Sequence, residues 1–188
     1  SADALVHVVR CFQNGDVMHP LQKVDPVRDC NLLEDELLLT DLAVVEKRLE
    51  RLKKENKKDR EFEVLSKLLE AGENGTPFRE IELSAAEQQL IAGFGFLSLK
   101  PLMLLGNYGD ESIGEEDPSG LAAYAKEKGF ALVEFCGAME MEVSQLAEEE
   151  RAAFREDLGL GEESRTRFLK TAYDMLGLMS FLTAGEPE

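Results

Sequence analysis

The stretch "KPLMLLGNYGD", Lys100–Asp110, decides the fold class, because a short apolar run ends there abruptly in turn-forming residues. Pro101 is compatible only with the first position of a strand or with an edge strand, since proline has no N–H to donate to a sheet. Asn107-Tyr108-Gly109 then breaks the run. We therefore predict a buried strand over Lys100–Gly106, followed by a loop.

Two further apolar runs flank this one. The run Ala4–Val9, "ALVHVV", is short and rich in valine, which favours a strand covered on both faces, as in parallel sheets. His7 has no second histidine, cysteine or acid at ligand spacing, so we expect it to be a core residue. The third run is Phe130–Phe135, and between the second and third runs lies a helical stretch that begins after Asp117-Pro118 and ends at Gly129. Strands that alternate with crossover helices predict a parallel α/β sheet.

The remaining segments complete the predicted secondary structure. Residues 11–31 carry several turn signals and are expected to form a loop, although Asp25-Pro26 is also compatible with a helix start. After Phe135 we expect a helical stretch through about Asp157 and another from Glu163 to Leu176. Residues 178–183 are apolar enough for a last strand.

Residues 31–76 have a different pattern, in which apolar residues alternate spacings of three and four as on one face of a long helix. The first series comprises Leu38, Leu42, Val45, Leu49 and Leu52, and the second comprises Phe62, Leu65, Leu68 and Leu69. Two such series separated by a short polar stretch predict an antiparallel helical coiled-coil hairpin. We expect residues 31–76 to be an insertion in a domain formed by residues 1–30 and 77–188. Ser84 and Glu87 match a capping box that starts a helix through about Ala92.

Composition limits the classes of function. The chain has 188 residues, 44% of them hydrophobic and 31% charged, which suits a soluble globular protein of one domain, or of one domain plus an insertion. Its formal net charge of −17 disfavours general binding to nucleic acids, DNA included. No apolar run reaches the roughly 18 residues of a membrane span. The three cysteines have no CxxC spacing, so we expect reduced thiols and a cytoplasmic protein that does not bind membranes.

Basic residues concentrate between Lys47 and Arg60, against the average charge. The four that mark the turn of the hairpin are Lys53, Lys54, Lys57 and Lys58. One interpretation is a solvated helix face. The other is an anion-facing tip, for instance towards RNA.

Two loops at strand ends are candidates for a binding site, since ligands of open α/β sheets lie outside the carboxyl ends of the strands. In the first loop, Asn107 is followed three residues later by Asp110, whose carboxylate can accept two N–H bonds from one guanine edge. In the second, Cys136-Gly137-Ala138 offers small residues past which a base could approach the backbone. Each loop alone is a weak signal and fits an ordinary turn better. Together the two loops end successive strands in the right order, which favours a nucleotide-binding site.

The chain resembles the YchF family, an Obg-related branch of the translation-factor GTPases. The matching segments are "DALVHVVRCF", "KVDPVRD", "VEKRLERLKK", "KPLMLLGN", "DLGL" and "LMSFLTAGE", which extend from Asp3 to Glu186. The resemblance implies a Ras-like P-loop NTPase fold interrupted by an antiparallel coiled coil, followed in the family by a TGS domain. It also implies a ribosome-associated ATPase or GTPase, a purine nucleotide bound at Asn107, Tyr108, Asp110, Cys136, Gly137 and Ala138, and Mg²⁺ in the intact protein.

Two departures from the family pattern qualify these expectations. The family more often has Glu where Asp110 stands, so either Asp110 or Glu111 could take the role of the base-reading carboxylate, and the choice between ATP and GTP stays open. No G-x-x-x-x-G-K-[ST] motif occurs in the sequence, and in the family this motif lies before "DALVHVVR". We therefore expect this chain alone to hydrolyse neither nucleotide, and Ala4–Val9 to be a strand with an open edge.

The alternative function is a non-enzymatic module whose hairpin tip binds a ribosomal or other anionic partner. A nucleophile-and-base arrangement is not evident, because none of the cysteines has a plausible histidine partner. We assign no catalytic residue and no metal ligand.

Overall fold

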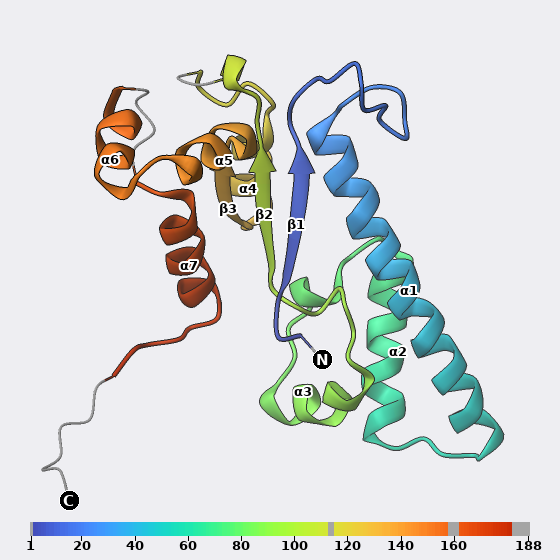
Figure 1. Cartoon of the computed structure of the whole chain (residues 1–188). Coiled ribbons are helices and arrows are strands. Elements are labelled where there is room, and N and C mark those ends of the chain that lie inside the picture. The colour runs from blue at the N-terminus through green and yellow to red at the C-terminus, as the bar shows by residue number, and fades with distance from the viewer. Residues whose placement is uncertain (1, 113–114, 158–161, 182–188) are drawn as a thin grey trace, which may run out of the picture. The chain divides into compact units, whose positions relative to one another are not determined.

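The computed structural model describes residues 2–112, 115–157 and 162–181 (Figure 1). The chain divides into two compact units. One, the hairpin unit, comprises Val27–Pro101 with the first residues up to Leu5. The other, the sheet unit, comprises Val6–Pro26 and the residues from Leu102 onwards.

The hairpin unit is built on two antiparallel helices, α1 (Pro26–Lys54) and α2 (Arg60–Glu73) (Figure 1). Helix α1 begins at Pro26, so the loop expected over residues 11–31 is wrong for its last residues. The start at the Asp25-Pro26 pair is correct, since a proline in the first turn loses no helical hydrogen bond. The Arg48 guanidinium joins the two helices through paired bonds to the Glu61 carboxylate, at 2.5 and 2.9 Å.

The core of this unit confirms both apolar series. The buried cluster consists of Leu38, Val45, Leu49, Leu52, Val64, Leu65, Leu68, Phe78, Ile91 and Phe96. Leu42, Phe62 and Leu69 are partly buried and pack against it. Both helices therefore bury the face on which the series lie, and the short helices after α2 cover the remainder of the cluster.

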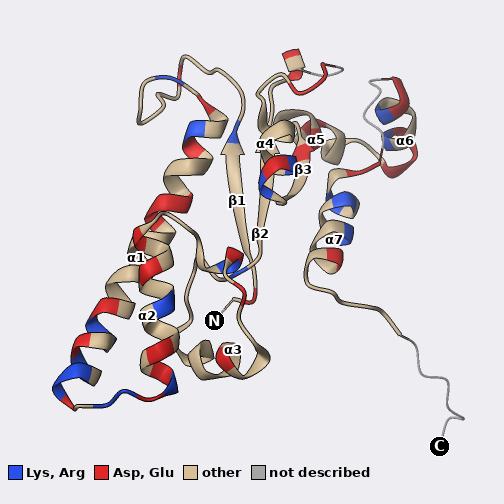
Figure 2. Cartoon of the chain, turned by 180° about the vertical axis from the view of Figure 1, so that it is seen from behind, with Lys and Arg blue, Asp and Glu red and all other residues tan. Residues whose placement is uncertain are grey.

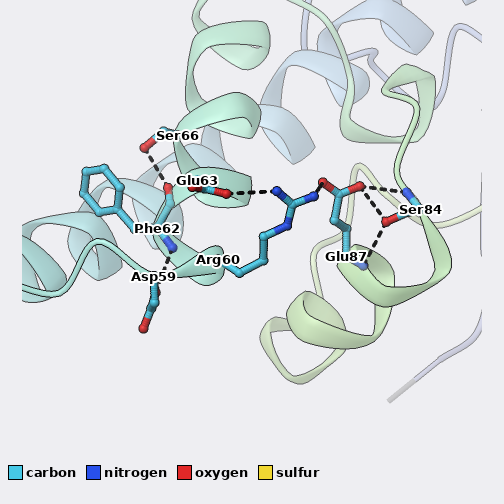
Figure 3. Close-up of polar contacts among 7 residues, drawn as sticks. All are labelled: Asp59, Arg60, Phe62, Glu63, Ser66, Ser84 and Glu87. Atoms are coloured by element: carbon cyan, nitrogen blue, oxygen red, sulfur yellow. Dashed lines mark hydrogen bonds and ion pairs between the residues drawn. The ribbon is translucent and has the colours of Figure 1, made fainter.

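The segment after α2 returns along the hairpin through η1 (Phe78–Glu80), α3 (Ala85–Ile91) and η2 (Ala92–Phe94). The capping box at the start of α3 is confirmed, because Ser84 and Glu87 bond reciprocally. Figure 3 shows Arg60 between two carboxylates, donating to Glu63 and to Glu87 at 2.9 Å each, which ties the start of α2 to the start of α3.

Buried Asp41 fixes the end of this returning segment. It is 3% exposed, and its carboxylate accepts the backbone N–H groups of Leu97 and Ser98 at 2.9 and 2.6 Å. The Ser98 hydroxyl donates to the same carboxylate at 2.7 Å. These bonds satisfy a buried charge, which would be costly without partners.

The sheet unit contains a three-stranded parallel sheet in the order β1-β2-β3. The strands are β1 (Leu5–Arg10), β2 (Leu102–Asn107) and β3 (Ala131–Phe135), each within two residues of its predicted bounds. β1 is an edge strand among the described residues, as expected.

The expectation that β1 is covered on both faces is wrong. Val6 and Val8 are 44% and 59% exposed, whereas Val9 is buried. Successive side chains on a strand point to opposite faces, so the described chain covers only one face of β1. His7 lies on the covered face and is partly buried rather than fully enclosed.

Within the described residues of the sheet unit, four helices accompany the strands: α4 (Leu121–Lys128), α5 (Gly137–Gln145), α6 (Glu148–Asp157) and α7 (Ser164–Met175). Gly129 ends α4 with positive φ, as predicted. The helical stretch expected through Asp157 is interrupted between α5 and α6 by the extended backbone of Leu146.

The last predicted strand is absent from the described residues 178–181, and residues 182 and 183 lie outside the described part of the chain. Met179 and Phe181 are 83% and 81% exposed, because no neighbouring strand pairs with this segment. Apolar composition alone is therefore insufficient for a strand here. Within residues 2–112, 115–157 and 162–181, no helix has the length and apolarity to cross a bilayer.

Candidate functional site

The turns after β2 and β3 lie side by side at the same end of the sheet. Asn107 pairs in register with Phe135, and the N–H of Tyr108 donates to the Phe135 carbonyl at 2.8 Å. The Asn107 side-chain carbonyl accepts the N–H of Gly137 at 3.0 Å. The Asn107 backbone carbonyl accepts the N–H of Cys11, beyond β1, at 2.8 Å. Asn107 thus joins the three segments that follow the strands.

Gly137 suits this close approach. A Cβ atom at position 137 would lie 3.1 Å from the Asn107 side-chain oxygen, tighter than most contacts of Cβ atoms, so the Asn107 side chain would have to shift by a few tenths of an ångström. Gly137 is the first residue of α5, Cys136 before it is buried, and Ala138 is exposed. The sequence therefore placed these three residues correctly beside Asn107, although their role towards a ligand stays a prediction.

Tyr108 points into the unit rather than towards solvent. Its side chain is only 8% exposed, and its hydroxyl shares a 2.8 Å hydrogen bond with the Ser119 hydroxyl, just before α4. Burial is the main cause that raises the pKa of Tyr108 above its usual value. Burial also raises the pKa of the neighbouring Cys11 thiol, to about 11. Both groups are therefore neutral at physiological pH and pack against the loop that follows Asn107.

Sequence reasoning missed Ser119 and Cys11 as supports of this loop. Ser119 follows Asp117-Pro118, a pair that predicts a helix start. The Asp117 carboxylate does accept N–H groups in the first turn of α4, from Ala122 and Ala123, at 2.9 and 3.0 Å. The signal that the sequence offers is the Ser119 hydroxyl two residues after Asp117. This pattern is too common to identify a residue that supports the loop.

Two carboxylates follow Asn107 and behave differently. Asp110 is exposed at the start of η3 (Asp110–Ser112), and its carboxylate accepts the N–H of Glu111 at 3.1 Å. The Glu111 carboxylate folds back over Gly109, where an added Cβ would lie 2.0 Å from its Oε2 atom. Gly109 thus leaves room for the Glu111 carboxylate beside the strand end, although Glu111, like Asp110, is exposed.

A polar cluster holds α5 in place behind the site. The Glu140 carboxylate on α5 accepts hydrogen bonds from Arg155 on α6 at 2.9 Å and from the Ser164 hydroxyl on α7 at 2.5 Å. Partial burial tends to raise the pKa of Glu140, but the bonds from Arg155 and Ser164 outweigh it and lower the pKa overall. Glu140 is therefore ionised at neutral pH and links three helices.

The four tip lysines lie together at the turn of the hairpin, in the other unit. Lys53 and Lys54 end α1, and Lys57 and Lys58 lie in the connection to α2; all four are exposed. Figure 2 shows this turn as a concentration of basic residues. Lys57 forms an ion pair with Glu55 at 3.0 Å. Within the described part of the chain, the other three lysines form no salt bridge.

The chain is similar to curated proteins named YchF. It is 37% identical over 193 residues to the ribosome-binding ATPase YchF of Haemophilus ducreyi and 36% identical over 195 residues to that of Bacillus subtilis. Each alignment covers 99% of this chain and 53% of the relative, so the chain spans about half the length of these relatives. No protein-family model matches the chain.

The fold gives the same result. The structure of the Schizosaccharomyces pombe YchF GTPase superimposes with a TM-score of 0.84 at 26% sequence identity, covering 98% of this chain and 53% of that one. Sequence and fold thus agree over nearly every residue of the chain, which belongs to the YchF family.

Proposed function

We propose that this chain supplies the base-binding end of the nucleotide-binding domain of a ribosome-associated ATPase or GTPase. The observation that carries the proposal is the bond from Gly137 to the Asn107 side chain, which holds two loops together at the carboxyl ends of β2 and β3. Ligands of open α/β sheets bind at such ends. The relatives named above are a ribosome-binding ATPase and a GTPase, which is the activity expected of such a domain.

In this proposal, the residues divide into supports and contacts. Asn107 and the buried Tyr108 hold the loops, whereas the backbone of Gly137 and Ala138 approaches the base. A carboxylate that follows Asn107 accepts N–H bonds from the base edge. Guanine presents two adjacent N–H donors to a carboxylate, so an aligned Asp110 or Glu111 favours GTP; without that alignment, the preference for guanine is lost.

The chain has no residues for the phosphates. The sequence lacks the Gly-rich loop and lysine that bind phosphates and the following hydroxyl that binds Mg²⁺. We therefore expect weak binding through the base alone and no hydrolysis of ATP or GTP by residues 1–188.

A titration followed by NMR tests this proposal. We expect ATP or GTP, but not CTP, to shift the backbone amides of Asn107, Gly137 and Ala138 in the ¹⁵N-labelled chain. Asn107→Ala should abolish the shifts, and Lys54→Ala, in the hairpin unit, should leave them unchanged. The absence of shifts at these amides with either purine nucleotide would contradict the proposal, as would hydrolysis that disappears in Asn107→Ala.

A second candidate function rests on the tip of the hairpin. Lys53, Lys54 and Lys58 are exposed and form no salt bridge among the described residues, so their charges are available to an anionic partner such as ribosomal RNA. Binding to phosphates by such a cluster displaces counterions and weakens steeply as salt rises, whereas binding of a base does not.

Charge reversal tests this second function. Replacing Lys53, Lys54, Lys57 and Lys58 with Glu should abolish binding of RNA by the chain and remove its salt dependence. The same variant should keep the nucleotide-induced shifts at Gly137, which separates the two functions. RNA binding that survives the four substitutions would exclude the tip as the contact.

A further inference from the structure

A pocket on the side of the hairpin is not explained by either proposed function. It has a volume of about 490 Å³ and lies wholly within the hairpin unit. Its lining residues are Ala43, Val44, Lys47, Arg48 and Arg51 on α1 and Phe94 in η2. The volume lies within the range of pockets that hold small ligands. Its walls combine aliphatic side chains, one aromatic ring and three cations.

The aromatic ring of the pocket packs against the core. Phe94 stacks on Phe96 with ring centroids 5.3 Å apart and planes 4° apart, and Phe96 in turn meets Phe78 edge-on at 5.2 Å. Phe96 is 2% exposed and belongs to the buried cluster, whereas Phe94 is only partly buried. Phe94 therefore contacts the core through Phe96 and also lines the pocket. A flat ligand could extend this stack.

The cations continue from the pocket towards the tip. Lys47, Arg51 and Lys54 follow one another at intervals of four and three residues, so they share one face of α1 over about 10 Å. Arg48 and Arg51 are paired with Glu61 and Glu55 respectively. Lys47 and Lys54 form no salt bridge within the described ranges. An anionic chain lying along this face would meet positive charge from the pocket to the hairpin turn.

We infer that the pocket receives one unpaired base of a single-stranded RNA segment whose phosphates follow this face of α1 to the tip. The inference rests on the proposed binding of RNA by the tip and specifies the form of that RNA. Single-stranded nucleic acids are bound by a positive groove combined with aromatic side chains on which bases stack. A duplex keeps its bases stacked and paired, so it cannot place one in the pocket.

An acidic peptide with an apolar side chain is the competing occupant. It would satisfy the same cations and aliphatic walls. The stacked pair of Phe94 and Phe96 favours a base, because a base offers a flat aromatic face together with a phosphate on every nucleotide, whereas an acidic peptide supplies its charge and its apolar group on separate side chains.

The test uses a short oligoadenylate with 2-aminopurine at its centre, whose fluorescence falls when the base stacks. We expect the chain to bind it, to quench it, and to prefer it to a duplex of the same length. Phe94→Leu, which keeps an apolar side chain without the ring, should lose the quenching and weaken binding about tenfold. Val44→Glu, which puts an anion at the pocket, should do the same.

Leu39→Glu is the matched control for Val44→Glu. Leu39 is 60% exposed on the same helix and does not line the pocket, and Val44 is 40% exposed, so both changes add one charge at an accessible aliphatic position. The control should retain quenching and bind within about twofold of the unmodified chain, since an exposed charge outside the contact is screened by salt.

The outcomes distinguish the inference from the proposed function. Binding that the tip substitutions abolish but that Phe94→Leu and Val44→Glu leave intact would keep the tip function and overturn the pocket. Equal binding of duplex and single strand would also overturn it, as would displacement of the RNA by an acidic peptide that reaches the pocket with higher affinity. The absence of binding to any RNA would contradict both the proposed tip function and the inference about the pocket.

Discussion

The hairpin unit and the sheet unit bury their apolar side chains to different degrees. In the hairpin unit, the two predicted series meet each other and the returning segment, and ten side chains form one buried cluster. In the sheet unit, Val6 and Val8 on β1 and Met179 and Phe181 after α7 are exposed. Most of the exposed large apolar side chains of the described residues belong to the sheet unit. The hairpin unit therefore buries its large apolar side chains more completely than the described part of the sheet unit does.

Polar contacts differ between the units in a related way. In the hairpin unit they fasten ends of helices, as Glu87 does at the start of α3 and Asp41 does after η2. In the sheet unit such contacts also occur, at Asp117 and Glu140, but others join loops at the candidate site, as Asn107 and the hydroxyl pair of Tyr108 and Ser119 do. The contrast associates burial of apolar side chains with the hairpin unit and hydrogen bonds between loops with the strand ends of the sheet unit.

The largest effect that can test this contrast is a cavity in the hairpin core. Leu65 on α2 is fully buried among the apolar series, so Leu65→Ala should lower the free energy of unfolding of this unit by about 2–5 kcal/mol. Hydrogen exchange measured residue by residue should show lost protection throughout α1 and α2. Amides of β2 and β3 should keep theirs, because they belong to the other unit.

Leu39→Ala is the control for this substitution, since Leu39 is 60% exposed on α1. Its effect should stay within about 0.5 kcal/mol, as for most surface changes. If Leu65→Ala removed protection equally from β2 and β3, the two units would unfold together and the contrast would fail.

The hairpin could be predicted from sequence because its signal is local and repeated. Alternating spacings of three and four between Leu38 and Leu52 place all of these residues on one helix face, and only an equivalent face can cover it. The start at Pro26 was less certain, since the same residues serve a loop or a first helical turn.

The order of the strands in the sheet could be predicted, but which side chains are buried around them could not. Short apolar runs located β1, β2 and β3, and the rule for parallel strands brought Asn107 and Gly137 together. The alternation of faces along β1 was missed, because a run of valines does not show which face is covered. The inward turn of Tyr108 was missed for a similar reason: its partner Ser119 belongs to a different loop, and only the folded chain brings the two hydroxyls together.

A middle-sized effect is expected at Asn107. Asn107→Ala removes the acceptor of the Gly137 N–H bond and leaves that donor without its partner, which should cost about 1–3 kcal/mol. Asn107→Asp keeps an oxygen at this position and should cost less. Denaturation monitored at β2 and β3, with exchange of the Gly137 amide, measures the loss. An unchanged Gly137 amide in Asn107→Ala would show that the bond does not hold the loops.

The smallest effect is a pH dependence at the start of α3, and it sharpens the contrast between caps and strand ends. Hydrogen bonds from the Ser84 backbone N–H and hydroxyl, at 2.8 Å each, lower the pKa of Glu87 from its usual 4.5, and Arg60 contributes in the same direction. A carboxyl whose pKa is lower in the folded state contributes stability that is complete above its unfolded pKa and is lost as the pH falls through the folded value.

Below pH 4.5, protection of the α3 amides should therefore decline in the unmodified chain, and this decline should be absent in Glu87→Gln, which does not titrate. The Tyr108 amide, bonded to a backbone carbonyl of β3, has no titrating acceptor and should not follow the same curve. Parallel loss at both places would mean that acid acts on the whole molecule, so that the cap of α3 has no pH response of its own.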